Sequence, residues 1–355
     1  MLHHPAPNSM NTNRKLAGFG HCSEFPRATQ CARVRYMRIV SLLPSATEIL
    51  FALGLDEEIV GVSHECDFPL RAKTKTTVVS SRLPKEATPA ETDRLVREHV
   101  ERGESIYAVN RDRLEELAPD LIFTQDLCHV CAATPEELGA ALATISKQPE
   151  IISLDPHDLG DVWRDILWIG EATGRRERAQ QLVTHIGERL GRLKAQLASQ
   201  SEQPRVAVLE WLQPFYVGGH WVPEMVEHAG GIDVLGKAKA PSRRVSLQEI
   251  VDAAPEVIFI APCGYVADQA RDEYLSVTFP EEWYTIPAVR DGRIFALDAN
   301  GHVSRPAGRL VTGIESMAKA MHPQIEVPVK AMLGMLTVPA THMRNRAAAA
   351  GTPTF

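Results

Sequence analysis

The chain has 355 residues, with 45 acidic against 38 basic side chains and a formal net charge of −7. This mild acidity argues against nucleic acid or an anionic membrane as the main partner. No apolar run reaches the roughly 18 residues that a membrane-spanning helix needs, so the sequence predicts no such helix. Six cysteines in so long a chain do not indicate a disulfide scaffold.

Residues 1–36 lack hydrophobic periodicity and are rich in arginine. They contain no apolar core of roughly 7–15 residues, which a secretory signal would have. We interpret them as a disordered or misassigned N-terminal extension, with Met37 as the candidate start. The absence of a visible signal predicts a cytoplasmic location, and a periplasmic one is the alternative.

The first convincing strand covers residues 38–43 and ends in a Pro-Ser loop. A helix is predicted over 46–53, where Gly54 closes it, and a second short strand follows at 59–62. These elements open a predicted N-terminal α/β lobe at residues 37–156.

A similar succession opens a second predicted lobe at residues 204–322. A strand at 205–209 is followed by a loop with proline and glycine and by a helix over 223–228. The remaining residues, 323–355, are interpreted as an accessory tail with a short helix and a flexible end.

Two segments, 110–123 and 245–259, repeat one pattern. Each starts with a short helix that a proline stops and continues into a strand that is apolar throughout, as strands covered on both faces must be. Alternating strands and helices imply parallel sheets with right-handed crossovers. The predicted fold is therefore α/β, with two Rossmann-like parallel-sheet lobes.

The segment between the lobes, residues 157–203, is predicted to consist of connecting helices. Apolar positions at helical spacing indicate helices over 161–173 and 176–199. The second has about 24 residues and is roughly 36 Å long at about 1.5 Å per residue, enough to reach from one lobe to the other. Because a helix resists bending, we expect only a small ligand-driven closure.

This order of elements resembles the helical-backbone class of solute-binding proteins, which serve ABC importers for cobalamin, ferric siderophores and haem. The resemblance rests on the two lobes, the connecting helix, the motif SLLPSATE at 41–48 and the two repeats. The segment GVSHECDFP at 61–69 looks like that of the cobalamin-binding branch. The resemblance implies a corrinoid in the cleft between the lobes, a permease as partner and no covalent chemistry. A ferric siderophore or haem is the alternative ligand.

Comparison with this family by position implies ligand-binding and docking residues. Its cobalamin binders carry aromatic rings at positions that match Glu65, Arg82, Arg244 and Asn300, and Phe215 keeps a family aromatic. Importer docking in the family uses one acidic residue on each lobe. Asp112 lies at the first of these positions, and Gln248 or Glu249 at the second.

A cysteine-containing loop follows the predicted strand at 121–123. Cys128 and Cys131 have the Cys-x-x-Cys spacing that can hold a soft metal or cycle as a dithiol, and His129 lies between them. His64 and Cys66 occupy the loop after another strand of the same lobe and could complete a metal site. Small buried cysteines that pack a loop are the alternative.

Other residues at the carboxyl ends of strands are candidates for ligand contact. Glu65 and Arg82 are interpreted as a cleft ion pair, as ligand contacts or as a solvated surface pair. Ser304 lies at the predicted start of the last helix. The backbone amides there could bind an anionic group of the ligand, and proline capping of the helix is the alternative interpretation of the segment. The aromatic residues after the first strand of the second lobe suit a large planar ligand, although half of them should be core. The set of predicted ligand-binding residues also includes Ser45, His64, Cys128, His129, Trp211, Tyr216 and Trp221.

The sequence contains no nucleotide-binding glycine loop, no serine-nucleophile elbow and no His-Glu-x-x-His zinc motif. It predicts a monomeric, non-enzymatic protein that holds a corrinoid and needs no cofactor. The competing hypothesis is an enzyme or metal chaperone that works through Cys128 and Cys131.

Overall fold

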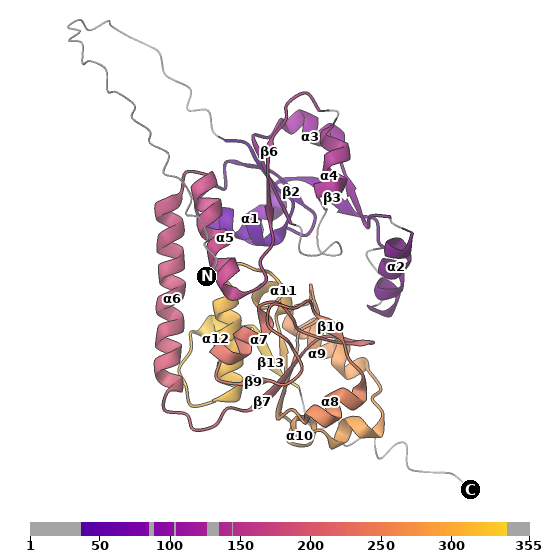
Figure 1. The fold of residues 1–355 in the computed structure, drawn as a ribbon, viewed down its shortest axis with the longest axis vertical. Coiled ribbons are helices and arrows are strands. Elements are labelled where there is room, and N and C mark those ends of the chain that lie inside the picture. Colours follow the sequence, from indigo (N-terminus) through magenta and orange to yellow (C-terminus); the bar gives the residue numbers. More distant parts are fainter. Residues whose placement is uncertain (1–36, 85–88, 103, 126–134, 144, 339–355) are drawn as a thin grey trace, which may run out of the picture. The chain divides into compact units, whose positions relative to one another are not determined.

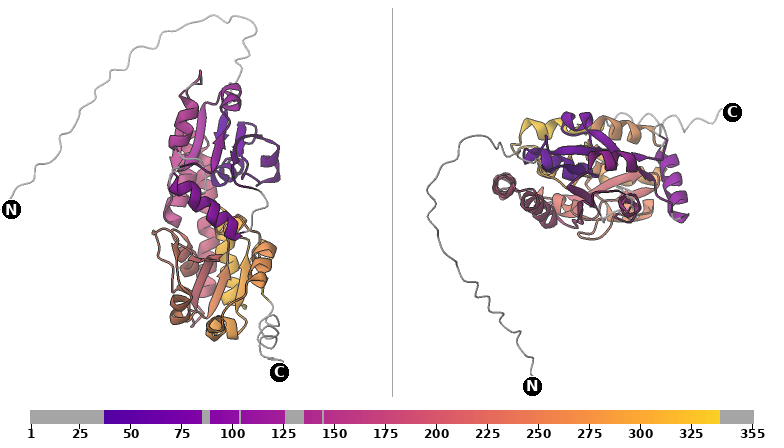
Figure 2. Two further views of the ribbon diagram at one scale, coloured as in Figure 1. Left: turned by 90° about the vertical axis from the view of Figure 1, so that its right-hand side faces the viewer. Right: turned by 90° about the horizontal axis from the view of Figure 1, so that it is seen from above.

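The computed structural model describes residues 37–84, 89–102, 104–125, 135–143 and 145–338 (Figures 1 and 2). The residues from Met37 onward cluster in one compact unit. The predicted extension at 1–36 lies outside the described residues. Among the helices of the described ranges, none is long and apolar enough to cross a membrane.

The first lobe is built on a six-stranded sheet in the order β4-β3-β2-β1-β5-β6. Neighbouring strands are parallel except for the pair β3 and β4, which is antiparallel. The strands are β1 (Ile39–Ser41), β2 (Ile59–Ser63), β3 (Thr76–Ser81), β4 (Tyr107–Val109), β5 (Leu121–Gln125) and β6 (Glu150–Leu154). The helices are α1 (Pro44–Ala52), α2 (Pro89–Glu101), α3 (Arg111–Leu117) and α4 (Pro135–Leu142).

The second lobe has a seven-stranded sheet in the order β10-β8-β7-β11-β12-β13, with β9 beside β7. The strands are β7 (Arg205–Leu212), β8 (Phe215–Val217), β9 (Ile232–Asp233), β10 (Arg243–Arg244), β11 (Val257–Ile260), β12 (Ile294–Leu297) and β13 (Met335–Thr337). The helices are α7 (Val222–His228), α8 (Leu247–Ala253), α9 (Ala267–Ser276), α10 (Pro287–Arg290), α11 (Ala299–His302), α12 (Leu310–Met321) and α13 (Val329–Leu333).

The two α/β lobes of the prediction are confirmed, but both sheets are mixed rather than parallel: the first has the single antiparallel pair β3–β4, and the second has more. The central strands β7, β11 and β12 are parallel, whereas β8, β10 and β13 run antiparallel to their neighbours. Only two residues, Gln213 and Pro214, separate β7 from β8. So short a connection makes a hairpin, since a parallel neighbour needs a crossover of a dozen or more residues.

The predicted internal repeat is visible in the ends of α3 and α8. The side chains of Asn110 and Ser246 each accept a hydrogen bond from the backbone amide three residues later, at 3.0 and 3.2 Å. Both helices end at an alanine in the left-handed conformation, Ala118 with φ 40° and Ala254 with φ 43°. The two segments are therefore the same helix-to-strand unit, used once in each lobe.

An acidic residue after each of these helices ties the unit to the first strand of its lobe. Asp120 Oδ2 accepts from the amide of Arg38 at 2.8 Å, and Glu256 Oε2 accepts from the amide of Arg205 at the same distance. The pairs Pro119-Asp120 and Pro255-Glu256 thus fix the start of a central strand, β1 in the first sheet and β7 in the second.

Two helices, α5 (Leu159–Ala172) and α6 (Arg176–Leu197), form the predicted connection between the lobes (Figure 1). With 22 residues, α6 is about 33 Å long. Arg178 near its start donates to the carbonyl of Leu53 in the first lobe at 2.8 Å, and Arg189 pairs with Glu315 of α12 at 2.6 Å. The connector therefore contacts both lobes directly.

Each sheet is covered on both faces, which explains the continuously apolar strands. In the first lobe, Ile39 and Phe123 pack on the face that α1, α5 and α6 cover. Val40 and Ile122 point to the opposite face, where they meet Leu114 of α3. Adjacent residues on a strand point to opposite faces, so both must be apolar when both faces are buried.

Residues placed in the accessory tail by the sequence pack into the second lobe. The short predicted helix is present as α13, and Ser316 of α12 donates to the carbonyl of Ala331 within it at 2.7 Å. β13 then pairs with β12 as an edge strand, and Val338 is buried in the core. The described part of the tail is thus a structural part of this lobe.

Candidate functional site

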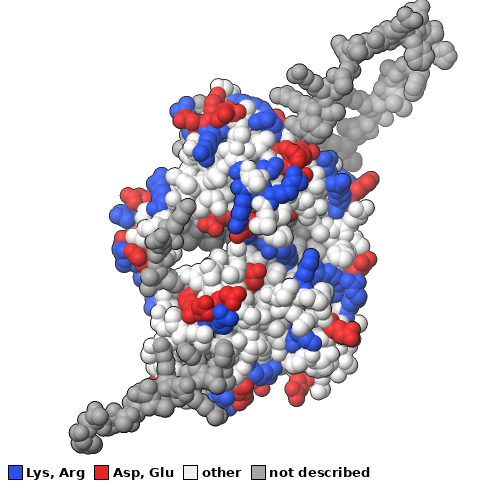
Figure 3. Space-filling view, turned by 180° about the vertical axis from the view of Figure 1, so that it is seen from behind, with Lys and Arg blue, Asp and Glu red and all other residues white. Residues whose placement is uncertain are grey.

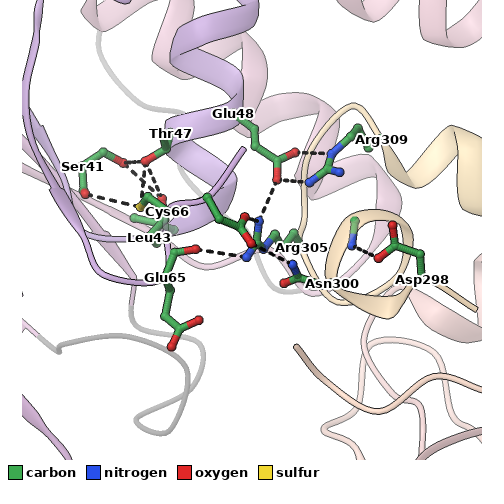
Figure 4. Close-up of polar contacts among 12 residues, drawn as sticks. Ser41, Leu43, Thr47, Glu48, Glu65, Cys66, Asp298, Asn300, Arg305 and Arg309 are labelled. Carbon is green, nitrogen blue, oxygen red and sulfur yellow. Dashed lines mark hydrogen bonds and ion pairs between the residues drawn. The ribbon is translucent and has the colours of Figure 1, made fainter. Parts of the chain in front are cut away.

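The loop after β2 in the first lobe meets the loop after β12 in the second, and these loops carry the main polar contacts between the lobes (Figure 4). Both loops leave the carboxyl ends of parallel strands, where open α/β sheets bind ligands. We call the five residues that join the lobes here the interlobe cluster. Its members are Glu48, Asp67, Asn300, Arg305 and Arg309.

Glu48 of α1 is the buried acid of the interlobe cluster, and only 6% of its surface is exposed. Its carboxylate accepts from Arg309 Nε at 2.8 Å and from Arg305 Nη1 at 3.3 Å. Burial raises the pKa of Glu48, while the hydrogen bonds and charges of the two arginines oppose that shift. A buried carboxylate is costly without such partners.

Asp67 forms the second contact between the lobes. Its Oδ1 accepts from Arg305 Nη1 at 2.5 Å, and its Oδ2 accepts from Asn300 Nδ2 at 3.1 Å. Burial by itself would raise the pKa of Asp67, but the hydrogen bond and charge of Arg305 outweigh burial and hold it below its usual value. Arg305 Nη2 also donates to the carbonyl of Glu65 at 3.1 Å. One arginine therefore satisfies three acceptors of the first lobe.

An aromatic contact extends the interlobe cluster. The guanidinium of Arg309 lies 3.8 Å from the ring centre of Phe68, which belongs to the first lobe. Such a cation–π contact adds attraction where the ring is partly exposed, as it is here. Beside these contacts the space-filling view shows an opening between the lobes (Figure 3). The arrangement can hold the two lobes together beside this opening.

Cys66, one of the predicted metal ligands, is buried and its thiol already has hydrogen-bond partners. Its Sγ accepts a hydrogen bond from Thr47 Oγ1 at 3.0 Å and lies 3.9 Å from the carbonyl of Ser41. Burial raises the pKa of its thiol to about 12, so the thiolate that binds metals is not formed near neutral pH. In the described part of the chain, no three His, Cys, Asp or Glu side chains are grouped for a metal. Cys128, His129 and Cys131 lie outside the described residues.

His64 and Glu65 pair with one another at the carboxyl end of β2. His64 Nε2 lies 3.0 Å from Glu65 Oε1, and this contact is the main reason that the pKa of Glu65 is lowered. Half of the Glu65 side chain is exposed. The predicted ion pair between Glu65 and Arg82 is therefore wrong, because Arg82 is exposed at the end of β3 and Glu65 faces its neighbour His64 instead.

The aromatic residues of the second lobe divide between site and core. Trp211 is partly buried at the carboxyl end of β7, with its ring edge-on to that of Tyr265 at 6.2 Å. Its Nε1 is buried and has no hydrogen-bond partner in the described structure. Trp221 is 5% exposed and donates to the carbonyl of Val303 at 2.8 Å. The prediction of Trp221 as a ligand contact is therefore wrong, since the hydrophobic core encloses it.

Phe215 and Arg244 line a cavity of about 580 Å³ whose described walls come from the second lobe. The Phe215 ring stacks on that of Trp283, with 5.6 Å between their centres, and Trp283 is fully buried. Tyr216 follows on β8 and pairs with Arg244 of the edge strand β10. The structure thus gathers these three predicted residues beside the β7–β8 hairpin, away from the interlobe cluster.

The structure treats the two predicted serines differently. Ser45 is buried within α1, where only 3% of its surface is exposed, so the prediction that it contacts a ligand is wrong. Ser304 lies between α11 and α12, because α12 starts at Leu310 and not at the Ser-Arg-Pro segment, so the predicted helix start is wrong. The Oγ of Ser304 is buried and lacks a partner in the described structure, and its contact with a ligand stays a prediction.

The two predicted docking acids occupy equivalent helices. Asp112 is exposed in the first turn of α3, and Glu249 is exposed in the first turn of α8. Glu249 already accepts from the amide of Ser246 at 2.8 Å and pairs with Arg243 at 2.8 Å, which lowers its pKa to about 2. It therefore carries its charge throughout the physiological range.

Sequence reasoning placed Asn300 in the cleft but missed the other four members of the interlobe cluster as site residues. One signal was present in the sequence: Glu48 follows a run of small and apolar positions and precedes Ile-Leu-Phe-Ala-Leu. A charged residue on a helix with so little polar surface must find a partner. Its partners could not be read from the sequence, because they are 257 and 261 positions away.

Comparison with known proteins reveals relatives along most of the chain. A family described as periplasmic binding protein matches residues 39–300. An uncharacterised ABC transporter substrate-binding lipoprotein of Bacillus subtilis is 25% identical over 295 residues, which cover 81% of this chain and 80% of the relative. A vitamin B12-binding protein of Vibrio cholerae is 24% identical over 289 residues, which cover 79% of this chain and 87% of the relative.

Solved structures share the fold. The periplasmic vitamin B12-binding protein of Vibrio cholerae has a TM-score of 0.59 at 23% identity and covers 80% of this chain and 96% of its own. A periplasmic haem-binding protein of Pseudomonas aeruginosa has a TM-score of 0.62 at 19% identity and covers 82% of this chain and 94% of its own. At these identities the similarity establishes the fold.

The comparisons overturn the predicted cytoplasmic location. The matched family is one of periplasmic binding proteins, and the relative from Bacillus subtilis is a lipoprotein. These findings indicate a location outside the cytoplasm. The prediction failed because it relied on the absence of a recognisable signal in the first 36 residues.

Proposed function

Since this chain belongs to the periplasmic binding protein family, we propose that it binds a corrinoid of the cobalamin type and presents it to the permease of an ABC importer. The ligand would lie between the two lobes and leave chemically unchanged. The proposal therefore includes no catalytic step and no resident cofactor.

The observation that carries the proposal is the meeting of two separate sheets at their carboxyl ends, beside an opening between the lobes (Figures 3 and 4). A corrin presents a broad apolar face and a rim of amide groups. Trp211 supports a contact with the face, since its ring is partly buried and its Nε1 lacks a partner in the described structure. Glu65, which is half exposed, and Asn300 offer an acceptor and an amide to the rim.

A haem or another ferric chelate is the second candidate, and His64 is the observation that favours it. Its side chain is 23% exposed at the carboxyl end of β2. Neutral imidazole is a common axial ligand of haem iron. Breaking the contact with Glu65 would free Nε2 for this role.

The docking proposal rests on Asp112 and Glu249. Both are exposed acids in the first turns of the repeated helices α3 and α8. One carboxylate on each lobe could pair with a basic residue of each permease subunit. Such rim charges set orientation and association rate more than affinity.

Titration of the purified chain with cobalamin, haemin and a ferric siderophore tests the proposal. Changes in visible absorbance and in tryptophan fluorescence report binding. We expect saturable one-to-one binding of cobalamin. Saturation by haemin alone would support the second candidate, and the absence of saturable binding for all three ligands would refute both.

A further inference from the structure

A second cavity, of about 650 Å³, lies where α6, the loop before α12 and α13 come together. Its basic lining residues are His185, Arg189, Arg192, His302, Arg309 and Lys330. Asp298 is the one acidic residue among its described lining. Basic side chains from three separate segments of the chain therefore surround one space.

The sequence spacing on α6 explains part of this gathering. His185, Arg189 and Arg192 are four and three positions apart, which places them on one face of the helix. Lys330 is contributed by α13, the helix that packs against α12. The cavity thus exists only because the C-terminal segment folds back onto the second lobe.

The charges around the cavity do not balance. Arg189 is neutralised by Glu315 at 2.6 Å, and Arg309 is held by Glu48. Among the described residues, Arg192 and Lys330 have no acidic partner within ion-pair distance. The lining thus contains these two exposed cations and a single carboxylate, that of Asp298, which already accepts from the amide of Gly301 at 2.8 Å.

His302 belongs to the same lining. Its Nδ1 is buried and has no hydrogen-bond partner in the described structure. Burial lowers the pKa of His302 and the charges of Arg309 and Arg189 act in the same direction, although Asp298 opposes them. The ring is therefore mainly neutral near pH 7.5, so the positive charge of the lining comes from its arginines and Lys330.

The cavity also has an apolar side, since Phe68 is 43% and Leu333 is 76% exposed there. Its volume is within the range of roughly 300–1,000 Å³ that is typical of small-molecule sites. We propose that this cavity binds a small organic phosphate, whose phosphate group is recognised by Arg192 and Lys330 and whose carbon skeleton lies against Phe68 and Leu333. Guanidinium and ammonium groups are the usual partners of phosphate.

Calorimetric titration of the full chain at constant ionic strength tests the proposal, with phenyl phosphate, inorganic phosphate and benzoate as probes. We expect saturable binding of phenyl phosphate, weaker binding of inorganic phosphate and the weakest binding of benzoate. No saturable heat with either phosphate would overturn the proposal. Benzoate binding as tight as phenyl phosphate would show that phosphate is not the group recognised.

The double substitution Arg192→Gln and Lys330→Gln should weaken phenyl phosphate binding by about tenfold or more, because two charge-assisted contacts are lost. A matched pair, Lys194→Gln and Arg290→Gln, removes the same charge from exposed positions outside the cavity lining. An equal loss in both double variants would indicate non-specific attraction and overturn the proposal. Both double variants should bind the metal chelate between the lobes with equal affinity. The phosphate proposal and the proposed function are therefore tested independently of one another.

Discussion

Arg305 of the second lobe donates from Nη1 to Asp67 Oδ1 of the first lobe at 2.5 Å. The same guanidinium reaches Glu48 and the carbonyl of Glu65. Because Arg305 is 7% exposed, these contacts are shielded from water. This arginine is thus the central residue in the contact between the lobes.

Replacing Arg305 with alanine should lower the free energy of unfolding by about 3 kcal/mol, because a buried acid is left with one partner fewer. Urea denaturation followed by circular dichroism measures this change. Arg176→Ala is the matched control, since Arg176 is exposed and pairs with Glu171 on the surface. The control should leave stability nearly unchanged, because water screens a pair of exposed charges. Equal losses in the two variants would contradict the central role of Arg305.

The contact of Asp67 should make stability depend on pH. Its pKa in the folded protein lies below the ordinary value of 3.8, so folding favours the charged form. The stabilisation is present at neutral pH and is lost as pH falls through and below about 4. Asp67→Asn should therefore lower Tm more at pH 7 than at pH 3. A difference in Tm that does not change with pH would rule out this charge effect.

Glu273 should show the opposite dependence. Burial raises its pKa from 4.5 to about 7, and its Oε2 has no partner in the described structure. Folding thus favours the protonated form, so the charge costs stability increasingly as pH rises from about 4.5 to above 7. Glu273→Gln should raise Tm by about 2 °C at pH 8 and by less at pH 5, as measured by scanning calorimetry. A gain in Tm at pH 5 equal to that at pH 8 would disprove the assignment.

Trp211 should contribute directly to ligand affinity. Trp211→Ala removes a partly buried ring at the carboxyl end of β7 and should weaken binding of the preferred chelate by about tenfold, equal to about 1.4 kcal/mol. Trp168→Ala is the control, because Trp168 is 47% exposed on the connecting helix α5. Absorbance titration of the two variants distinguishes them. Unchanged affinity in Trp211→Ala would place the ligand elsewhere.

The pattern of the fold could be predicted where local residues determine it. The spacing of apolar residues over 176–199 predicted α6 to within two residues, because helix periodicity depends on neighbours three and four positions away. The antiparallel strands β8 and β13 were not predicted. The direction of β8 depends on the two-residue turn that joins it to β7. β13 belongs to the C-terminal tail, which lies outside the repeated helix-to-strand unit and pairs with β12 at the edge of the sheet.

Residue type identified candidates for the site, but burial decided among them. Trp211 and Trp221 are both aromatic residues after the same strand, yet Trp221 is enclosed by the core and Trp211 is partly exposed. Cys66 has a metal-binding side chain but lies under α1, next to Thr47. Neither difference is visible in the sequence, since it depends on which elements pack above each residue.

By itself, the sequence determined the two lobes, their repeated helix-to-strand unit and the helical connection, because all of these follow from backbone periodicity and capping over short distances. The tertiary structure alone decided which charged residues meet between the lobes. Arg305 and Asp67 are 238 positions apart, and both are ordinary loop residues in the sequence. Their contact exists because the connecting helices bring the two sheets together, and the buried guanidinium of Arg305 needs an acidic partner there.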